Sequence, residues 1–235
     1  VKAVFDQSVE TEAPLADDSL VLTWANNWEA FAQGPPLEEE EPTVEQLSAL
    51  FHRVDGMRGP PYADFSVFTP FNRRISRANK FTAYLPQADG TWLAKEIPGP
   101  PNFAVWGYCW KVFRCASIQL GVLKESALTA YFQTIESLVA DWPECWSLIY
   151  LAEDKGRAEG LVRKKRLFDA QVKAGCVPPA LWSDTAPWSA CLFTLANDES
   201  YWNKQVRNLA VSWMTHGRHG TPRTKEQVIT ERAFS

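Results

Sequence analysis

Residues 98–113, PGPPNFAVWGYCWKVF, place a proline-rich stop directly before an apolar segment with two tryptophans. Phe103, Trp106 and Trp110 recur at a spacing of three or four, which predicts one buried helix face over about residues 103–120. Asn102 precedes this segment and can cap its first turn. The sequence therefore predicts a central, tryptophan-rich helix around which the rest of the chain packs.

The stretch before this helix, AYLPQADGTWLAKEI (residues 83–97), is typical of a β-hairpin. We expect strands at 81–85 and 91–97, because Asp89-Gly90 supplies the positive φ angles that a tight hairpin turn needs. An isolated two-stranded hairpin is only marginally stable in water. The hairpin is therefore expected to pack against helices.

Further helices are predicted on both sides of this block. Thr43 and Gln46 form a capping-box pattern at the start of a helix that runs to about residue 53. Pro143 suits the first turn of a helix that continues to residue 173. The remaining predicted helices cover residues 125–140, 187–196 and 198–216, and Asp198 is expected to cap the last of them.

The predicted fold class is mainly α: a helical bundle-like domain with one β-hairpin at about 81–97, and with room for two helical subdomains. The predicted divisions are an acidic arm at 1–42, a helical core at 43–174, a C-terminal helical subdomain at 175–216 and a polar tail at 217–235. The two helical parts are expected to meet near 174–186, where Gly175, Pro178 and Pro179 interrupt the helical pattern.

Composition sets broad limits on the class of protein. The 235 residues include eleven Trp, which dominate any core they enter because each buries a large area. No run of 18 apolar residues is present, so no membrane span is expected, and residues 1–20 do not resemble a secretory signal. The five cysteines form no C-x-x-C pair, which favours small core residues in an intracellular, reducing compartment.

Charge is distributed unevenly along the chain. Residues 1–50 carry eleven acidic residues against Lys2, a net charge of −10, which leaves +6 for the rest of the chain. An acidic arm and a basic body are typical of proteins that contact nucleic acid or another copy of themselves, although charge for solubility alone explains the pattern equally well. Within the arm, the spacing of Trp24, Trp28 and Phe31 predicts a short amphipathic helix that docks on a partner protein, on the body or on a neighbouring subunit.

Two basic clusters are candidate nucleic-acid-binding sites. The first consists of Arg73, Arg74, Arg77 and Lys80; the second is the run Arg163, Lys164, Lys165 and Arg166. Arg and Lys side chains bind phosphates without regard to base sequence, and neighbouring aromatic rings can stack on unpaired bases. The competing interpretation is a solvated helix face or internal ion pairs.

The sequence shows no recognisable catalytic, cofactor or metal-binding motif. His52, His216 and His219 have no Cys nearby that would complete a zinc site. Neither a G-x-S-x-G elbow nor a glycine-rich phosphate loop occurs. We therefore expect no catalytic residues, no cofactor and no metal.

Several segments resemble the gag-like, non-enzymatic region of retroelement polyproteins from protist algae. The resemblance covers roughly residues 69–213. It rests on the order and spacing of Thr69-Pro-Phe-Asn-Arg-Arg74, Lys80-Phe81, Asp89-Gly-Thr-Trp92, Glu96-Ile-Pro-Gly-Pro100, Trp106-x-x-x-Trp110-Lys-Val-Phe-Arg114, Tyr131, Trp142-Pro-x-x-Trp146 and Pro187-Trp188. This chain departs from the family pattern at Asn72, where the family usually has Gly, and in a less basic 153–166 segment.

The resemblance implies self-assembly into a capsid-like shell and packaging of an RNA, without a zinc-knuckle module in this chain. Three hypotheses follow. The first is a structural, non-enzymatic assembly protein that associates with itself and contacts nucleic acid. The second is an interaction subunit docked in a larger protein complex through its acidic arm, and the third is an enzyme with an unrecognised site.

Overall fold

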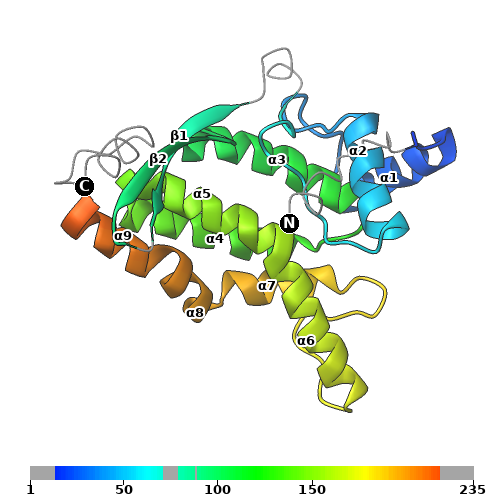
Figure 1. The fold of residues 1–235 in the computed structure, drawn as a ribbon. Coiled ribbons are helices and arrows are strands. Elements are labelled where there is room, and N and C mark those ends of the chain that lie inside the picture. The colour runs from blue at the N-terminus through cyan, green and yellow to red at the C-terminus, as the bar shows by residue number, and fades with distance from the viewer. Residues whose placement is uncertain (1–13, 71–78, 88, 218–235) are drawn as a thin grey trace.

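The computed structural model describes residues 14–70, 79–87 and 89–217. Within them the chain is mainly helical, with one two-stranded antiparallel hairpin, as the sequence predicts (Figure 1). The elements are α1 (Asp18–Phe31), α2 (Val44–Phe51), β1 (Lys80–Pro86), β2 (Trp92–Pro98), α3 (Phe103–Gln119), α4 (Glu125–Asp141), α5 (Trp146–Lys155), α6 (Leu161–Lys173), α7 (Trp188–Ala196), α8 (Glu199–Trp202) and α9 (Asn208–Ser212).

Short π-helical segments join several helices without a break. Gly156–Gly160 links α5 to α6, and Asn203–Arg207 links α8 to α9. The stretch from Pro143 to Lys173 is thus one continuous helical path, which confirms the predicted helix over 143–173. No helix in the part of the chain that the structure describes has the length and apolar character needed to cross a membrane.

Side chains cap the helices where the sequence predicts caps. Thr43 accepts a hydrogen bond from the Gln46 backbone N–H, and the Gln46 side chain accepts from the Thr43 backbone N–H. Asn102 accepts from the Val105 N–H at 3.0 Å, and Asp198 from the Tyr201 N–H at 2.9 Å. Each cap satisfies backbone donors that have no partner within the helix.

The hairpin packs on helices, as expected from its size. Its strands pair from Lys80↔Pro98 to Pro86↔Trp92, and Gly90 has φ 82° in the connecting turn. Strand β1 contacts α5. At the exit of β2, Gly99 has φ 139°, and a Cβ atom there would clash with the Tyr150 ring, so the close approach of hairpin and helix requires glycine.

Helix α3 forms the centre of the core. Trp106 is fully buried and Trp110 almost so, and their rings stack at a centroid distance of 5.1 Å. Trp110 also stacks on Tyr131 of α4 at 5.4 Å. The aromatic residues of the predicted face therefore bind α3 to its neighbours, as their spacing predicts.

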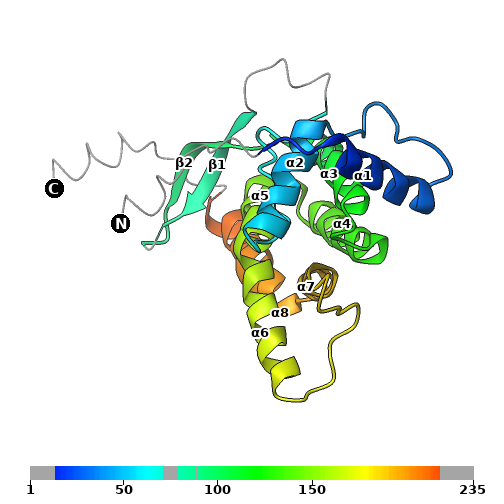
Figure 2. The same cartoon turned by 90° about the vertical axis from the view of Figure 1, so that its right-hand side faces the viewer.

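Within the described residues, the larger of two buried hydrophobic clusters unites segments that the sequence divides into arm, core and C-terminal subdomain. Helix α1, which lies in the predicted arm, packs on α3, and α7 of the predicted C-terminal subdomain packs on α4. Trp24 of α1, Trp188 of α7 and Trp202 of α8 belong to the same buried cluster as Trp106. The described part of the arm is therefore integrated into the body rather than separate from it (Figure 2).

Candidate functional site

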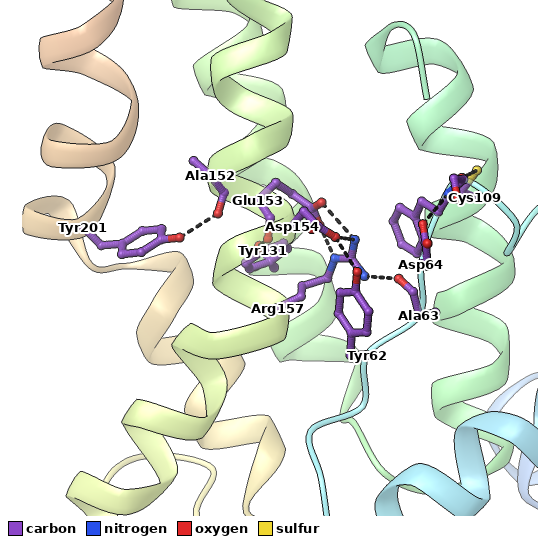
Figure 3. Close-up of polar contacts among 12 residues, drawn as sticks. Tyr62, Ala63, Asp64, Cys109, Tyr131, Ala152, Glu153, Asp154, Arg157 and Tyr201 are labelled. Carbon is purple, nitrogen blue, oxygen red and sulfur yellow. Dashed lines mark hydrogen bonds and ion pairs between the residues drawn. The ribbon is translucent and has the colours of Figure 1, made fainter. Parts of the chain in front are cut away.

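A buried ion pair is the most prominent polar feature of the interior. Glu153 at the end of α5 and Arg157 in the following π-helical turn are both fully buried (Figure 3). Two guanidinium nitrogens of Arg157 donate to the Glu153 carboxylate, Nη2 to Oε2 at 3.0 Å. Arg157 Nη1 donates to the Ala63 carbonyl oxygen at 2.6 Å. The pair thereby fixes the loop that precedes β1 against α5.

Aromatic rings enclose the Arg157 guanidinium. Its Cζ lies 3.9 Å from the ring centroid of Phe65 and 5.2 Å from that of Tyr62. The Arg53 guanidinium approaches the same Tyr62 ring at 5.0 Å, and the Tyr62 hydroxyl donates to Asp154 Oδ1 at 2.9 Å. Cation–π contacts in such desolvated surroundings add to the attachment of the loop.

Burial is the largest single influence on the pKa values of the ionisable groups in this cluster. Burial raises the pKa of the Glu153 carboxyl above its ordinary value, and this outweighs the opposing effect of the Arg157 charge. Burial by itself lowers the pKa of Arg157, but the Glu153 carboxylate outweighs this and leaves that pKa raised. Burial also raises the pKa of the Tyr62 hydroxyl, which therefore stays protonated at neutral pH. These contacts hold the loop around Tyr62 and Ala63 against the helix and therefore stabilise the fold.

The first predicted basic cluster lies mostly outside the described residues. Arg73, Arg74 and Arg77 fall in segment 71–78. Lys80 opens β1, and its Nζ lies 3.5 Å from Glu96 Oε1 on the adjacent strand. Both side chains are more than half exposed, so Lys80 is accessible to a ligand.

The second predicted cluster does not form a single patch. Successive residues of a helix point about 100° apart, so four consecutive cations on α6 point in different directions. Three of them are paired within the chain: Arg163 with Glu159 at 2.9 Å, Lys164 with Asp198 at 2.6 Å, and Lys165 with Asp169 at 2.7 Å. Arg166 is exposed. The internal ion pairs that the sequence left open as an alternative are therefore present.

A basic groove nevertheless lies between α6 and the helix that begins at α8. It encloses about 330 Å³ and is lined by Lys155, Arg163, Lys164 and Lys204, with Glu159 and Asp198, a net charge of +2. Lys155 and Lys204 are exposed, and Lys155 Nζ donates to Gln205 Oε1 at 3.4 Å. We refer to this feature as the α6–α8 groove. It can bind an anionic group.

The three aromatic residues predicted to dock on a partner, Trp24, Trp28 and Phe31, do lie on one helix. Trp24 and Trp28 are 3% and 6% exposed, so both rings pack within this chain. Phe31 is 44% exposed, and the Arg114 guanidinium lies 5.6 Å from its ring centroid. Of the three, Phe31 alone presents substantial surface to a partner while α1 stays docked.

The described residues contain no group of three His, Cys, Asp or Glu side chains placed to hold a metal ion. The side chains of His216 and His219 lie outside the described part. Cys109, Cys115, Cys145 and Cys191 are buried free thiols, and Cys176 is an exposed one. Burial raises the pKa of Cys115 and of Cys191 to about 12, so both thiols are protonated and unreactive at neutral pH.

Sequence reasoning missed the Glu153–Arg157 pair and the contribution of Lys155 and Lys204. A signal for the pair existed, since a Glu and an Arg four residues apart interrupt an otherwise apolar helix face. No such signal exists for Lys155 and Lys204, which line the same groove only because distant parts of the chain pack together.

No family model, curated protein or solved structure matches this chain.

Proposed function

We propose that the chain is a structural assembly protein of gag or capsid-like type that associates with itself and contacts nucleic acid. The resemblance of residues 69–213 to gag-like regions motivates this proposal. In this account the protein acts in a reducing, intracellular compartment, which suits a chain with free buried cysteines.

The exposure of helix α6 is the observation that supports this proposal most directly. It projects from the body together with the loop that leads to α7 (Figures 1 and 2). Only Leu161 and Phe168 of its 13 residues are buried, whereas ten of the 17 residues of α3 are buried. Leu167 is 49% exposed and Val177, in the following loop, 91%. A projecting helix with so little burial offers surface for contact with another molecule.

Nucleic-acid contact would use the exposed cations of α6. Arg163 is 70% exposed, and surface ion pairs such as Arg163–Glu159 contribute at most about 1 kcal/mol. A phosphate can therefore compete with Glu159 for Arg163 at little cost. Arg166 is exposed on the same helix, so two arginines are available. Binding of this kind is independent of sequence and weakens with salt.

A second candidate function is an interaction subunit in a larger complex. The observation that favours it is the exposed acidic run at Glu38, Glu39 and Glu41, just after the docked helix α1. In this alternative the run binds a basic partner protein, and the docked part of the arm holds it in place.

Light scattering behind size exclusion, with absorbance at 260 and 280 nm, tests the proposal on the full chain. The proposal predicts a uniform species heavier than the 26.5 kDa chain, with excess absorbance at 260 nm. A 26.5 kDa monomer with a clean protein spectrum would contradict it. A stoichiometric complex with a second protein would favour the alternative.

A companion variant tests the nucleic-acid contact. Reversing the charges of Arg163 and Arg166 together should reduce bound nucleic acid and flatten the salt dependence of binding, by about one unit of slope for each phosphate that is no longer neutralised. Lys95→Glu reverses one exposed charge on β2, away from α6, and as a control it should leave binding unchanged. Equal binding by wild type and the double variant would exclude α6 as the nucleic-acid-binding surface.

A further inference from the structure

The acidic run after α1 is a structured turn. The Glu40 backbone N–H donates to the Leu37 carbonyl oxygen at 2.8 Å, and the Glu40 carboxylate pairs with Lys111 of α3 at 2.8 Å. Pro42 is buried, and the capping box of α2 follows directly. Glu38, Glu39 and Glu41 are exposed, and Leu37 is 61% exposed beside them. We call residues 37–41 the acidic turn.

The α6–α8 groove has complementary properties. Its net charge is +2, and both of its carboxylates are already engaged, Glu159 with Arg163 and Asp198 with Lys164. Lys155 and Lys204 are the exposed cations that remain for a ligand from outside. Leu167, which is half exposed, adds an apolar surface to the lining. A segment with carboxylates beside one apolar side chain fits this combination.

The acidic turn and the groove belong to different sides of the molecule. In both views the segment between α1 and α2 lies in the upper part and α6 and α8 in the lower part (Figures 1 and 2). The turn is fastened to α3 through Lys111, so it cannot reach the groove of its own chain without breaking that pair.

We propose that the acidic turn of one copy binds in the α6–α8 groove of a second copy. Glu38 and Glu39 would pair with Lys155 and Lys204, and Leu37 would contact Leu167. This inference rests on the proposed self-association and identifies the surfaces that mediate it. Two different surfaces on each copy make a head-to-tail contact, which produces a closed ring or an open filament.

The energetics favour a weak, salt-sensitive contact that adds up over many copies. The turn is already ordered by Glu40 and Pro42, so binding costs little further conformational entropy. Each exposed charge pair contributes little by itself. Complementary charges mainly select the partner and fix the relative position of the two copies. Nucleic acid would compete for the same cations, which makes it the main alternative occupant.

A charge-swap experiment on the full chain tests the proposal. The turn variant, E38K/E39K, makes the acidic turn basic. The groove variant, K155E/K204E, makes the groove acidic. Each should raise the concentration needed for assembly by on the order of tenfold, because like charges then face each other. Mixing the two variants should restore assembly, since the reversed turn of one variant then meets the reversed groove of the other.

Two controls and the wild type separate the possible outcomes. Exposed Glu136 and Lys95 lie outside both surfaces, so Glu136→Lys and Lys95→Glu should leave the mass distribution unchanged, and circular dichroism checks that every variant folds. If wild type assembles and neither pair of substitutions alters its mass, this inference fails while the proposed function stands. If K155E/K204E loses nucleic acid but keeps its mass, the groove binds nucleic acid and the inference is overturned. A monomeric wild type overturns both.

Discussion

Two regions of one helical path, residues 143–173, use the same ion-pair spacing in opposite environments. Glu153 and Arg157 are four residues apart and fully buried. Glu159 and Arg163 are also four residues apart, and their side chains are 55% and 70% exposed. The two pairs are identical in chemistry, so any difference in their effects arises from the surroundings.

At equal spacing, burial determines how strongly each charge depends on its partner. Buried charges have lost their hydration, and each depends on its partner to compensate for that loss. Exposed charges keep their water and can exchange a partner at little cost. The buried pair at the end of α5 therefore stabilises the fold, whereas the exposed pair at the start of α6 can exchange its partner for another molecule.

The largest expected effect is the loss of the buried arginine. Arg157→Met removes the partner of Glu153 and leaves its carboxylate buried, which should lower the free energy of unfolding by about 3–5 kcal/mol. Urea denaturation followed by tryptophan fluorescence measures this. A loss below about 1 kcal/mol is typical of an exposed ion pair and would contradict the full burial of Glu153 and Arg157.

Removing both charges should cost less than removing one. The double variant E153L/R157M leaves no buried charge, but it leaves the Ala63 carbonyl without its donor, a loss of about 1–3 kcal/mol. A double-mutant cycle in urea measures the coupling between the two positions. If the double variant is less stable than R157M alone, the account of burial cost is wrong.

The partly buried pair Lys164–Asp198 should give an intermediate, pH-dependent effect. Burial raises the pKa of Asp198, but hydrogen bonds from Lys164 and from the Tyr201 N–H outweigh this, so the pKa is lowered. A lowered folded pKa means stability that is present above the ordinary value of 3.8 and is lost as pH falls through the folded pKa.

Asp198→Asn keeps a side chain that can cap α8 and removes the charge, so it isolates the pair. At neutral pH it should lower the free energy of unfolding by roughly 1 kcal/mol. The difference from wild type should shrink to nothing in acid, where Asp198 is protonated in both the folded and the unfolded state. Thermal unfolding at a series of pH values checks this, and a difference that persists in acid would contradict it.

The smallest expected effect is at the exposed pair. Arg163→Ala should change the free energy of unfolding by about 0.5 kcal/mol or less, because helix-surface pairs contribute only that much. Thermal unfolding of this variant beside R157M completes the comparison. A loss as large as that of R157M would mean that spacing alone determines the strength of these pairs.

Most of the fold could be predicted from local signals. These signals depend on residues close together in sequence: the caps at Thr43, Asn102 and Asp198, the Asp89-Gly90 turn and the aromatic periodicity of α3. They are enough to predict where the helices and strands begin and end. The docking of α1 on α3 could not be derived, because the spacing of Trp24 and Trp28 predicts an apolar face but not what covers it.

The candidate sites were harder to predict for the same physical reason. The run Arg163–Arg166 is contiguous in sequence but spreads around the helix, and carboxylates from three places neutralise most of it. Glu153 and Arg157 could be recognised as a pair, but the residues that contact them, among them Ala63, Phe65 and Tyr131, come from distant parts of the chain.

Sedimentation velocity of the full chain, over a range of concentrations and at two ionic strengths, shows whether charged contacts join copies of the protein. The screening length falls from roughly 10 Å at about 0.1 M salt to roughly 3 Å at about 1 M. We expect species heavier than 26.5 kDa at the lower salt concentration, and we expect them to dissociate toward 26.5 kDa at the higher one. A 26.5 kDa species at every concentration and at both ionic strengths would contradict this expectation.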